Sequence, residues 1–406
     1  MKHTGSALFQ EDQPVKKFFK SVSPNVIWLG LVSFLNDLSS EMILPVLPMF
    51  IESLGGGKMA VGLLGGIRDG LSSILNVLSG YWSAKTGKKK IFLQAGYLTS
   101  AVFKLLLGLC STFRGAIFFA SMERVGKGLR TAPRDAIISE SMNQKKGTGF
   151  GIHRAFDTMG AIIGSLTAFS LLWFFGVSFK SIILIAAGLS FAGVVPLLFV
   201  RESHQGSIHT TLSINLKQLP SNLKLFIFIA SIFSLGNFSY MFFILRAKQF
   251  LSGNLSEAIA VLLYVFFNIF YVLFSMPLGV LSDRIGKGKV IAAGYLLFSV
   301  VSFGFIFSSS MRGLMILFAL YGIANAALDA NQRAFVADSA GAQLRPIALG
   351  AYHTLTGLSA LPASLIAGLL GKYISDKAIF IYGASVSLVC VFLLILFLSY
   401  RRRELK

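Results

Sequence analysis

Cationic side chains recur inside a long apolar segment in the first half of this 406-residue chain. The segment 114–138 carries Arg124, Lys127, Arg130 and Arg134, and positions 124, 127, 131 and 134 follow the spacing of one helix face. A guanidinium pairs with a carboxylate or a phosphate at two points, which suits recognition of an anion. The pattern therefore predicts a cationic site for an anionic solute. Neighbouring apolar segments add three cations to this predicted site: Lys104, Arg68 and Arg154.

The same charges also have a structural interpretation, in which they pair with carboxylates and hold helices in register. The acidic side chains within the apolar segments of the first half are nearly as numerous as these cations. They are Asp37, Glu41, Asp69, Glu123, Asp135 and Asp157. Pairing is most strongly indicated for Arg154, because Asp157 follows three residues later on the same segment. For Arg134 the sequence favours neither substrate binding nor pairing with a carboxylate, and both interpretations stay open.

Two carboxylates in the first apolar segment are candidates for proton coupling. Asp37 and Glu41 lie four residues apart and so share a helix face. A carboxylate that faces an apolar cavity in one state and an arginine in another can bind and release a proton as the protein changes conformation. Glu41 is the first candidate and Asp37 the second. The chain contains no Gly-x-x-x-x-Gly-Lys-Ser/Thr run, so a proton gradient rather than ATP is the expected source of energy.

The second half carries fewer charges within its apolar segments and more aromatic side chains. Its candidate substrate contacts are Tyr240, Asn268 and His353. An aromatic wall is expected from five rings: Tyr240, Phe243, Tyr264, Phe267 and Tyr271. For any one ring, helix packing or lipid contact is the competing interpretation. His353 could also exchange a proton, and a hydrogen-bonded core position is its competing interpretation.

The elements that must position these side chains are membrane spans. The chain is 54% hydrophobic and 13% charged, its mean hydropathy is +0.72, and apolar stretches of spanning length recur along it. These stretches lack the period-2 alternation of barrel strands, so each is expected to be a helix. The sequence predicts an all-α integral membrane protein with twelve transmembrane helices. Their expected ranges are 25–51, 59–82, 89–111, 114–138, 149–176, 179–200, 223–246, 256–281, 288–310, 313–337, 346–371 and 377–400.

Polar stretches divide the chain into two halves. A tail of residues 1–22 precedes a six-helix half of residues 23–200, and a linker of residues 201–222 leads to a second six-helix half, 223–400, and a tail, 401–406. The net charge of +20 is concentrated in the tails, the linker and the loops on one side of the predicted membrane. By the positive-inside rule, both termini face the cytoplasm. Topology thus explains the charge without a nucleic-acid partner.

The two halves repeat each other at an offset of 199 residues. The loop after the second span, with Gly80 and Lys85, recurs after the eighth span with Gly279 and Arg284, and Arg134 maps onto Arg333. Such self-similarity indicates a duplication, and in a membrane protein it predicts two halves that enclose a site between them.

Twelve spans in two pseudo-symmetric halves, with a Gly-x-x-x-Asp-Arg-x-Gly signature at Gly279, Asp283 and Arg284, closely resemble the major facilitator superfamily. The resemblance implies transport by alternating access, with this loop as a gating latch. The first half departs from the signature, because Ala84 stands where the family usually carries Asp, although Gly80 and Lys85 are retained. The stretches 36–45 and 124–135 look like a bacterial branch with drug-exporter-like and siderophore-transporter-like members.

The resemblance and the residues together predict a secondary transporter, not an enzyme, in a bacterial inner membrane. It is expected to act as a monomer among membrane lipids, coupled to protons, without a cofactor or a metal. The expected solute is a small organic anion: a carboxylate siderophore, an organic acid or a phosphate ester. A proton-coupled multidrug exporter of lipophilic cations is the main alternative. A ferroportin-type metal transporter has only Asp37 and His353 suitably placed, and the charged interior argues against a scaffold that transports nothing.

Overall fold

The computed structural model describes residues 23–142, 146–202, 219–250, 255–308 and 310–404. The predicted tail 1–22, the linker residues 203–218 and the side chain of Asp69 lie outside this part. All regular structure in the described ranges is helical. The all-α prediction is therefore confirmed.

Within the described residues, the first half contains seven α-helices and one short 3₁₀ helix. They are α2 (Pro24–Ile43), α3 (Leu47–Ser53), α4 (Lys58–Thr86), α5 (Lys89–Leu109), α6 (Phe113–Ser141), α7 (Lys146–Phe175), α8 (Phe179–Ala192) and η1 (Val195–Phe199). The first expected span is divided between α2 and α3. Pro45 follows the end of α2 and cannot donate the backbone hydrogen bond that would continue it, and α3 begins with a proline in its first turn.

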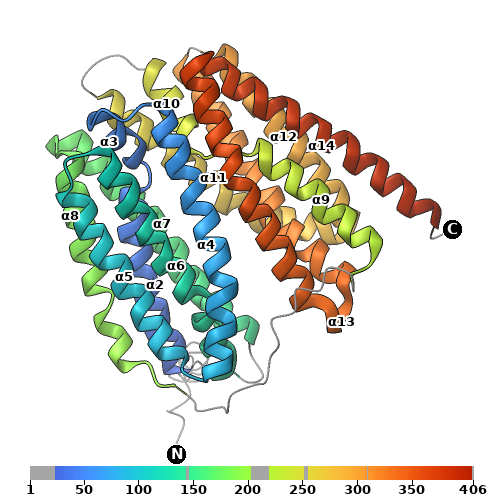
Figure 1. Ribbon diagram of the computed structural model, residues 1–406, viewed down its shortest axis with the longest axis horizontal. Coiled ribbons are helices and arrows are strands. Elements are labelled where there is room, and N and C mark those ends of the chain that lie inside the picture. Colours follow the sequence, from blue (N-terminus) through green and yellow to red (C-terminus); the bar gives the residue numbers. More distant parts are fainter. Residues whose placement is uncertain (1–22, 143–145, 203–218, 251–254, 309, 405–406) are drawn as a thin grey trace, which may run out of the picture.

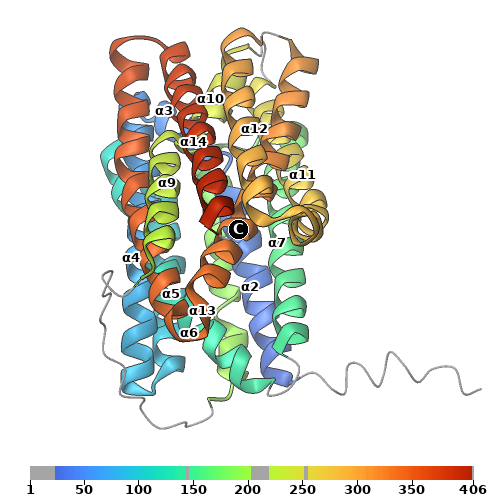
Figure 2. The same cartoon turned by 90° about the vertical axis from the view of Figure 1, so that its right-hand side faces the viewer.

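The second half repeats this pattern. Its helices are α9 (Ser221–Gly236), α10 (Met241–Phe250), α11 (Ser256–Ile285), α12 (Lys287–Phe307), α13 (Met311–Tyr373) and α14 (Asp376–Glu404). The seventh span is interrupted between α9 and α10, as the first is between α2 and α3. The long α13 contains two spans, because Gly341 has a φ of 70°, a left-handed conformation that interrupts the helix. In Figure 2 the two parts of α13 meet in a sharp turn.

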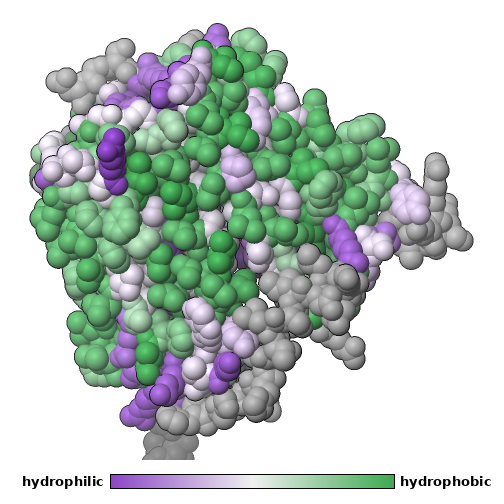
Figure 3. Space-filling view, in the orientation of Figure 1, coloured by the Kyte–Doolittle hydropathy of each residue, from purple (hydrophilic) through white to green (hydrophobic). Residues whose placement is uncertain are grey.

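Eleven helices of the described chain are long and apolar enough to cross a membrane. The remaining predicted span, 114–138, is α6, which has the length, at 29 residues, but carries the row of charged residues. Figure 3 shows hydrophobic residues covering the middle of the visible face, with most hydrophilic ones toward its edges. A helix with so many charges must turn them inward, because lipid-facing charges are costly.

The two halves approach each other at one end and separate toward the other (Figure 1). Two ion pairs join them at the end that carries residues 54–57 and 374–375: Lys58 with Asp376, and Lys248 with Glu52 at 3.5 Å. Between these pairs and the middle of the molecule, α4 and α13 pack closely. A Cβ added at Gly66 would lie 2.6 Å from the Leu361 carbonyl oxygen. We call this the closed end, and the opposite end, with residues 86–88, 201–202 and 286, the linker end.

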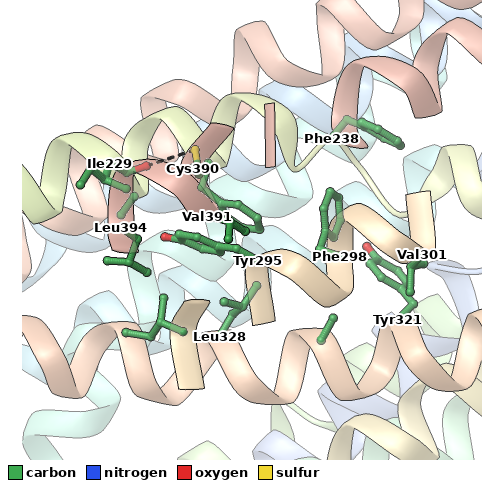
Figure 4. Close-up of a cluster of buried hydrophobic side chains, with 14 of the residues drawn as sticks. Ile229, Phe238, Tyr295, Phe298, Val301, Tyr321, Leu328, Cys390, Val391 and Leu394 are labelled. Atoms are coloured by element: carbon green, nitrogen blue, oxygen red, sulfur yellow. Dashed lines mark hydrogen bonds between the residues drawn. The ribbon is translucent and has the colours of Figure 1, made fainter. Parts of the chain in front are cut away.

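Aromatic rings fill the core of the second half (Figure 4). Phe233 stacks on Tyr295 with ring centroids 4.0 Å apart, and Phe243 stacks on Tyr321 at 4.4 Å. Phe243 is fully buried among other rings. The expectation that Phe243 belongs to a wall facing the solute is therefore wrong, because its helix turns this ring into the core.

Candidate functional site

A buried ionic cluster lies between α4 and α6. The Glu123 carboxylate is 3.5 Å from the Arg68 guanidinium and 3.4 Å from that of Arg124. All three side chains are buried. For Arg68 and Arg124, the structure thus supports the pairing interpretation, since one carboxylate is shared by cations from two helices.

Lys104 on α5 is held by hydroxyl groups rather than by a carboxylate. Its ammonium donates hydrogen bonds of 2.9 Å to the Ser39 and Ser40 hydroxyls of α2, and it lies 3.4 Å from the Ser190 hydroxyl. Lys104 and Arg68 face a cavity of about 10 Å³, which has room for roughly one water molecule. In this conformation neither predicted substrate contact reaches a space that a solute could occupy.

Two further cations of α6 differ in their surroundings. Arg130 is buried, donates to the Ser100 hydroxyl at 2.6 Å and lies 4.4 Å above the Tyr97 ring. Lys127 is half-buried, and no ion pair holds it within the described part of the chain. The face predicted to be cationic therefore contains residues with structural partners next to one without.

A larger cavity, of about 390 Å³, lies between the two halves toward the linker end. We call it the inter-half cavity. The first half contributes Arg134, Asp135, Phe150, His153, Arg154 and Asp157, and the second half contributes Tyr271, Ser275, Ala326, Asp329, Ala330 and Arg333. Arg134 and Arg154 were predicted from the sequence as substrate contacts. Arg333 was not, although the 199-residue offset pairs it with Arg134 and could have identified it.

The three arginines of the inter-half cavity are held differently. Arg134 pairs with Asp135 at 3.0 Å and donates to the Ser33 hydroxyl at 3.3 Å. Arg333 pairs with Asp329 at 2.6 Å, and the same carboxylate accepts a hydrogen bond of 2.7 Å from Tyr271. Arg154 is exposed and has no ion pair with any residue that the structure describes.

The expected pair of Arg154 with Asp157 is wrong. Asp157 instead lies 3.6 Å from the Nδ1 atom of His153, and His153 Nε2 is 2.8 Å from the Ser33 hydroxyl. His153 and Asp157 are one helical turn apart on the face of α7 that packs on α2, whereas Arg154 points away from it. Sequence reasoning missed His153, although its spacing from Asp157 was available as a signal.

Both predicted proton-coupling residues lie on α2. Glu41 accepts a hydrogen bond of 3.2 Å from the Tyr264 hydroxyl, which belongs to the other half. Asp37 accepts a bond of 3.3 Å from the Asn36 amide, and among described residues neither carboxylate forms an ion pair. The ring of Tyr240, predicted as a substrate contact, lies 5.3 Å from the Tyr264 ring, and its hydroxyl donates to the Leu44 carbonyl oxygen at 3.5 Å.

The other two predicted contacts of the second half lie apart from each other. Asn268 on α11 has a buried amide nitrogen with no hydrogen-bond partner among the described residues. His353 on α13 is half-buried, with its ring 5.1 Å from that of Tyr352.

The predicted latch residues make contacts within their own half. Lys287 lies 3.1 Å from Asp283 and 2.8 Å from Asp338 at the end of the first part of α13. Arg284 and Lys85 are exposed, and Gly279 and Gly80 lie inside α11 and α4. In the first half Lys89 pairs with Glu140 of α6. Each half thus ties its loop to the neighbouring helix end, although Ala84 replaces the usual acid in the first.

The described residues contain no group of three or more His, Cys, Asp or Glu side chains that could hold a metal ion. The polar chemistry of the site in this part of the chain is therefore that of guanidinium, carboxylate, imidazole and hydroxyl groups.

Sequence comparison finds relatives along the whole chain. The sequence profile of the Major Facilitator Superfamily matches residues 29–250 and 225–406. An uncharacterized MFS-type transporter of Methanocaldococcus jannaschii is 51% identical over 380 residues, which cover 93% of this chain and 95% of the relative. The multidrug resistance protein MdtG of Escherichia fergusonii is 24% identical over 289 residues, covering 68% and 69% of the two chains.

Solved structures with the same fold are also transporters. The nucleoside transporter NupG superposes with a TM-score of 0.78 at 16% identity, covering 92% of this chain and 99% of its own. A POT family transporter bound to a conjugated peptide gives a TM-score of 0.76 at 13% identity, covering 95% and 99%. At these identities the likeness concerns the fold.

Proposed function

The chain belongs to the Major Facilitator Superfamily, and from that premise we propose that this secondary transporter moves a small organic anion across the membrane in exchange for, or together with, protons. Carboxylates, including carboxylate siderophores, and phosphate esters are the proposed solute class. The proposed location is a bacterial-type inner membrane, with both termini in the cytoplasm.

The observation that carries the anion proposal is a set of uncompensated cations. Among the described residues, no carboxylate lies within ion-pair distance of four cations of the first half. These are Lys104, Lys127, Arg130 and Arg154. A charge left unpaired inside a membrane protein is costly, so an anionic ligand that supplies the missing partner gains correspondingly. Of these four cations, Arg154 lines the inter-half cavity, where a ligand has room to bind, and Arg134, which is paired with Asp135, lies at the same cavity.

The arrangement of the halves supports alternating access. The ion pairs of Lys58 with Asp376 and of Lys248 with Glu52 close one end, while the inter-half cavity lies toward the other. Both ion pairs involve partly exposed side chains, so they can break without exposing a fully buried charge. Exchange between two such arrangements would expose the same site to either side of the membrane in turn.

The hydrogen bond between Glu41 and Tyr264 supports proton coupling at α2, because it links a carboxylate of one half to the other half. Protonation of Glu41 changes this contact from a hydrogen bond to a carboxylate into one to a neutral acid, which is weaker. The charge of Glu41 would thereby bias the association of the two halves.

The anion proposal is tested by ligand-induced thermal stabilisation of the purified full-length protein. Ligands that bind the folded state raise its apparent stability by mass action. Citrate and phosphate esters are expected to stabilise the wild type, and Arg134→Ala is expected to lose this stabilisation. Arg114→Ala is the matched control, because Arg114 lies on the same helix but is exposed at the closed end. Equal stabilisation of both variants would contradict the proposed site.

Proton coupling is tested in proteoliposomes with Glu41→Gln. Accumulation driven by a pH gradient is expected to be lost, while exchange of labelled for unlabelled solute continues. Glu257→Gln, a half-exposed carboxylate at the closed end, is the control. An unchanged response to the pH gradient in Glu41→Gln would remove Glu41 as the proton carrier.

Export of lipophilic cations is the second candidate function. It is favoured by the relative named a multidrug resistance protein and by the hydrogen bond of Glu41 to Tyr264, whose ring lies near that of Tyr240, since a carboxylate with aromatic rings nearby can bind an organic cation. Stabilisation by tetraphenylphosphonium and not by anions, lost in Glu41→Gln, would favour this function over the first.

A further inference from the structure

The second half contains a separate polar pocket of about 200 Å³ between α9 and both parts of α13. Its polar lining has one charged residue, Asp329, and is otherwise uncharged, with Ser234, Asn237, Asn325, Gln332, Tyr352 and Thr356. We propose that this pocket binds the hydroxylated portion of the transported solute. The inference rests on the proposed function, because it makes the solute a polyhydroxylated organic anion, such as a sugar phosphate or a sugar acid.

The pocket wall is held in place by a buried hydrogen-bonded chain. The Gln332 amide donates to the Tyr295 hydroxyl at 3.1 Å, and the Tyr352 hydroxyl donates to the Gln332 carbonyl oxygen. All three side chains are buried. Tyr295 is also stacked on Phe233, another lining residue (Figure 4 shows Tyr295 within the core). Such a wall is fixed before a ligand arrives, which lowers the entropic cost of binding.

Several of the hydroxyl and amide protons around the pocket are already directed toward the protein. Ser234 donates to the Thr356 carbonyl oxygen at 2.8 Å, and Thr356 donates to the Tyr352 carbonyl oxygen at 2.7 Å. The Asn325 amide donates to the Tyr321 carbonyl oxygen at 2.9 Å. Each hydroxyl keeps lone pairs that can accept, and an amide that donates keeps its carbonyl oxygen as an acceptor. The lining therefore offers several acceptors, and the second N–H of the Asn325 and Gln332 amides remains a donor.

A pocket that offers both acceptors and amide donors suits a ligand whose groups donate and accept hydrogen bonds. Asp329 also borders the pocket, but Arg333 and Tyr271 already engage its carboxylate, so a cation is not required there. Hydroxyl groups donate without adding charge, and the apolar faces of Phe233 and Leu328 suit the C–H face of a sugar ring. These features favour a polyol over an ammonium group.

The pocket and the inter-half cavity share Asp329 in their lining. One solute can therefore place its anionic group near Arg134 and Arg154 while its hydroxyl groups enter the pocket of the second half. In this arrangement the first half recognises the anionic group of the solute and the second half recognises its hydroxyl groups.

The test compares three probes on the purified full-length protein by isothermal titration: glucose 6-phosphate, methyl phosphate and sorbitol. Thr356→Val removes one acceptor at constant shape. It is expected to weaken glucose 6-phosphate binding about fivefold, the equivalent of one neutral hydrogen bond, and to leave methyl phosphate unchanged. Asn325→Leu removes the side-chain amide of another lining residue and is expected to weaken glucose 6-phosphate binding at least as much. Thr354→Val is the matched control, because Thr354 is outside the pocket lining.

The outcomes separate this inference from the proposed function. If methyl phosphate binds as tightly as glucose 6-phosphate, or if both pocket variants leave the sugar phosphate unaffected, the hydroxyl subsite is overturned while the anion proposal stands. A different result would overturn the anion proposal and support the subsite. In that result sorbitol binds as tightly as glucose 6-phosphate, and Thr356→Val weakens the binding of sorbitol.

Discussion

The two halves of this transporter share one fold but bury different chemistry. At the offset of 199 residues, Arg68 and Glu123 of the first half correspond to Phe267 and Gly322 of the second. In the first half these positions form a buried ion pair between α4 and α6. In the second, Gly322 lets α13 approach the Phe267 backbone of α11 directly. The same helix contact is thus made once by charge and once by close packing.

This difference shows that a duplicated scaffold can specialise its halves without changing its architecture. Lys127 and Arg130 of α6 correspond to Ala326 and Asp329 of α13, whereas Arg134 and Arg333 keep the same charge. The conserved pair of arginines lies where the two halves face each other across the inter-half cavity. Divergence has therefore separated a charged interior from an aromatic and neutral polar one, while each half keeps an arginine at the shared boundary.

The largest expected effect comes from breaking the ionic contact of the first half. Glu123→Ala leaves the Arg68 and Arg124 guanidiniums near each other without their shared carboxylate. Removing one partner of a buried ion pair typically costs about 3–5 kcal/mol. We expect a matching drop in the free energy of unfolding, measured by denaturant titration in mixed micelles. The isosteric Glu123→Gln should recover part of the loss, and an unchanged midpoint in both would show that the cluster is not structural.

A smaller effect is expected from breaking the packed contact of the second half. Gly322→Ala places a methyl group against the Phe267 carbonyl, and overpacking of this kind costs about 1–3 kcal/mol. Gly350→Ala is the control, because no atom lies near the position of its added Cβ. The same titration should rank Gly322→Ala below Glu123→Ala and above Gly350→Ala. Equal stability of the two glycine variants would mean that the helices can separate at little cost.

Much of the fold could be predicted from the sequence, because it depends on local patterns. Long apolar runs and the 199-residue repeat identify the helices and the two halves without knowledge of any long-range contact. The arrangement of the site could not be predicted in the same way. Whether Asp157 meets Arg154 or His153 depends on the rotation of α7, which Gly160 and Gly164 set by packing on the backbone of α2.

The neutral pocket of the second half illustrates the same limit. Asn325, Gln332 and Thr356 are scattered over both parts of α13, and only the turn at Gly341 brings those parts together. Spacing along the chain gives no sign of such a pocket. Charged residues within apolar runs are conspicuous in a sequence, so sequence reasoning directed attention to the first half and did not predict this uncharged pocket in the second.

The smallest expected effect concerns the loops at the linker end. In both halves a lysine of the loop pairs with a carboxylate, but the exposure of these carboxylates differs between the halves. Lys287 has two exposed carboxylate partners, Asp283 and Asp338, whereas Lys89 has one less exposed partner, Glu140. Exposed ion pairs contribute roughly 0–1 kcal/mol to the stability of the conformation that contains them. Asp283→Asn should therefore slow turnover by no more than about fivefold and leave substrate affinity unchanged.

Glu140→Gln should slow turnover more than Asp283→Asn does, because Lys89 then has no second carboxylate within reach among the described residues. The double variant Asp283→Asn with Asp338→Asn should match Glu140→Gln, since it leaves Lys287 equally alone. Initial rates of solute exchange in proteoliposomes, measured at saturating solute, check this order. A larger defect in Asp283→Asn than in Glu140→Gln would mean that the signature carboxylate acts beyond its pair with Lys287, as a latch that biases the equilibrium between conformations.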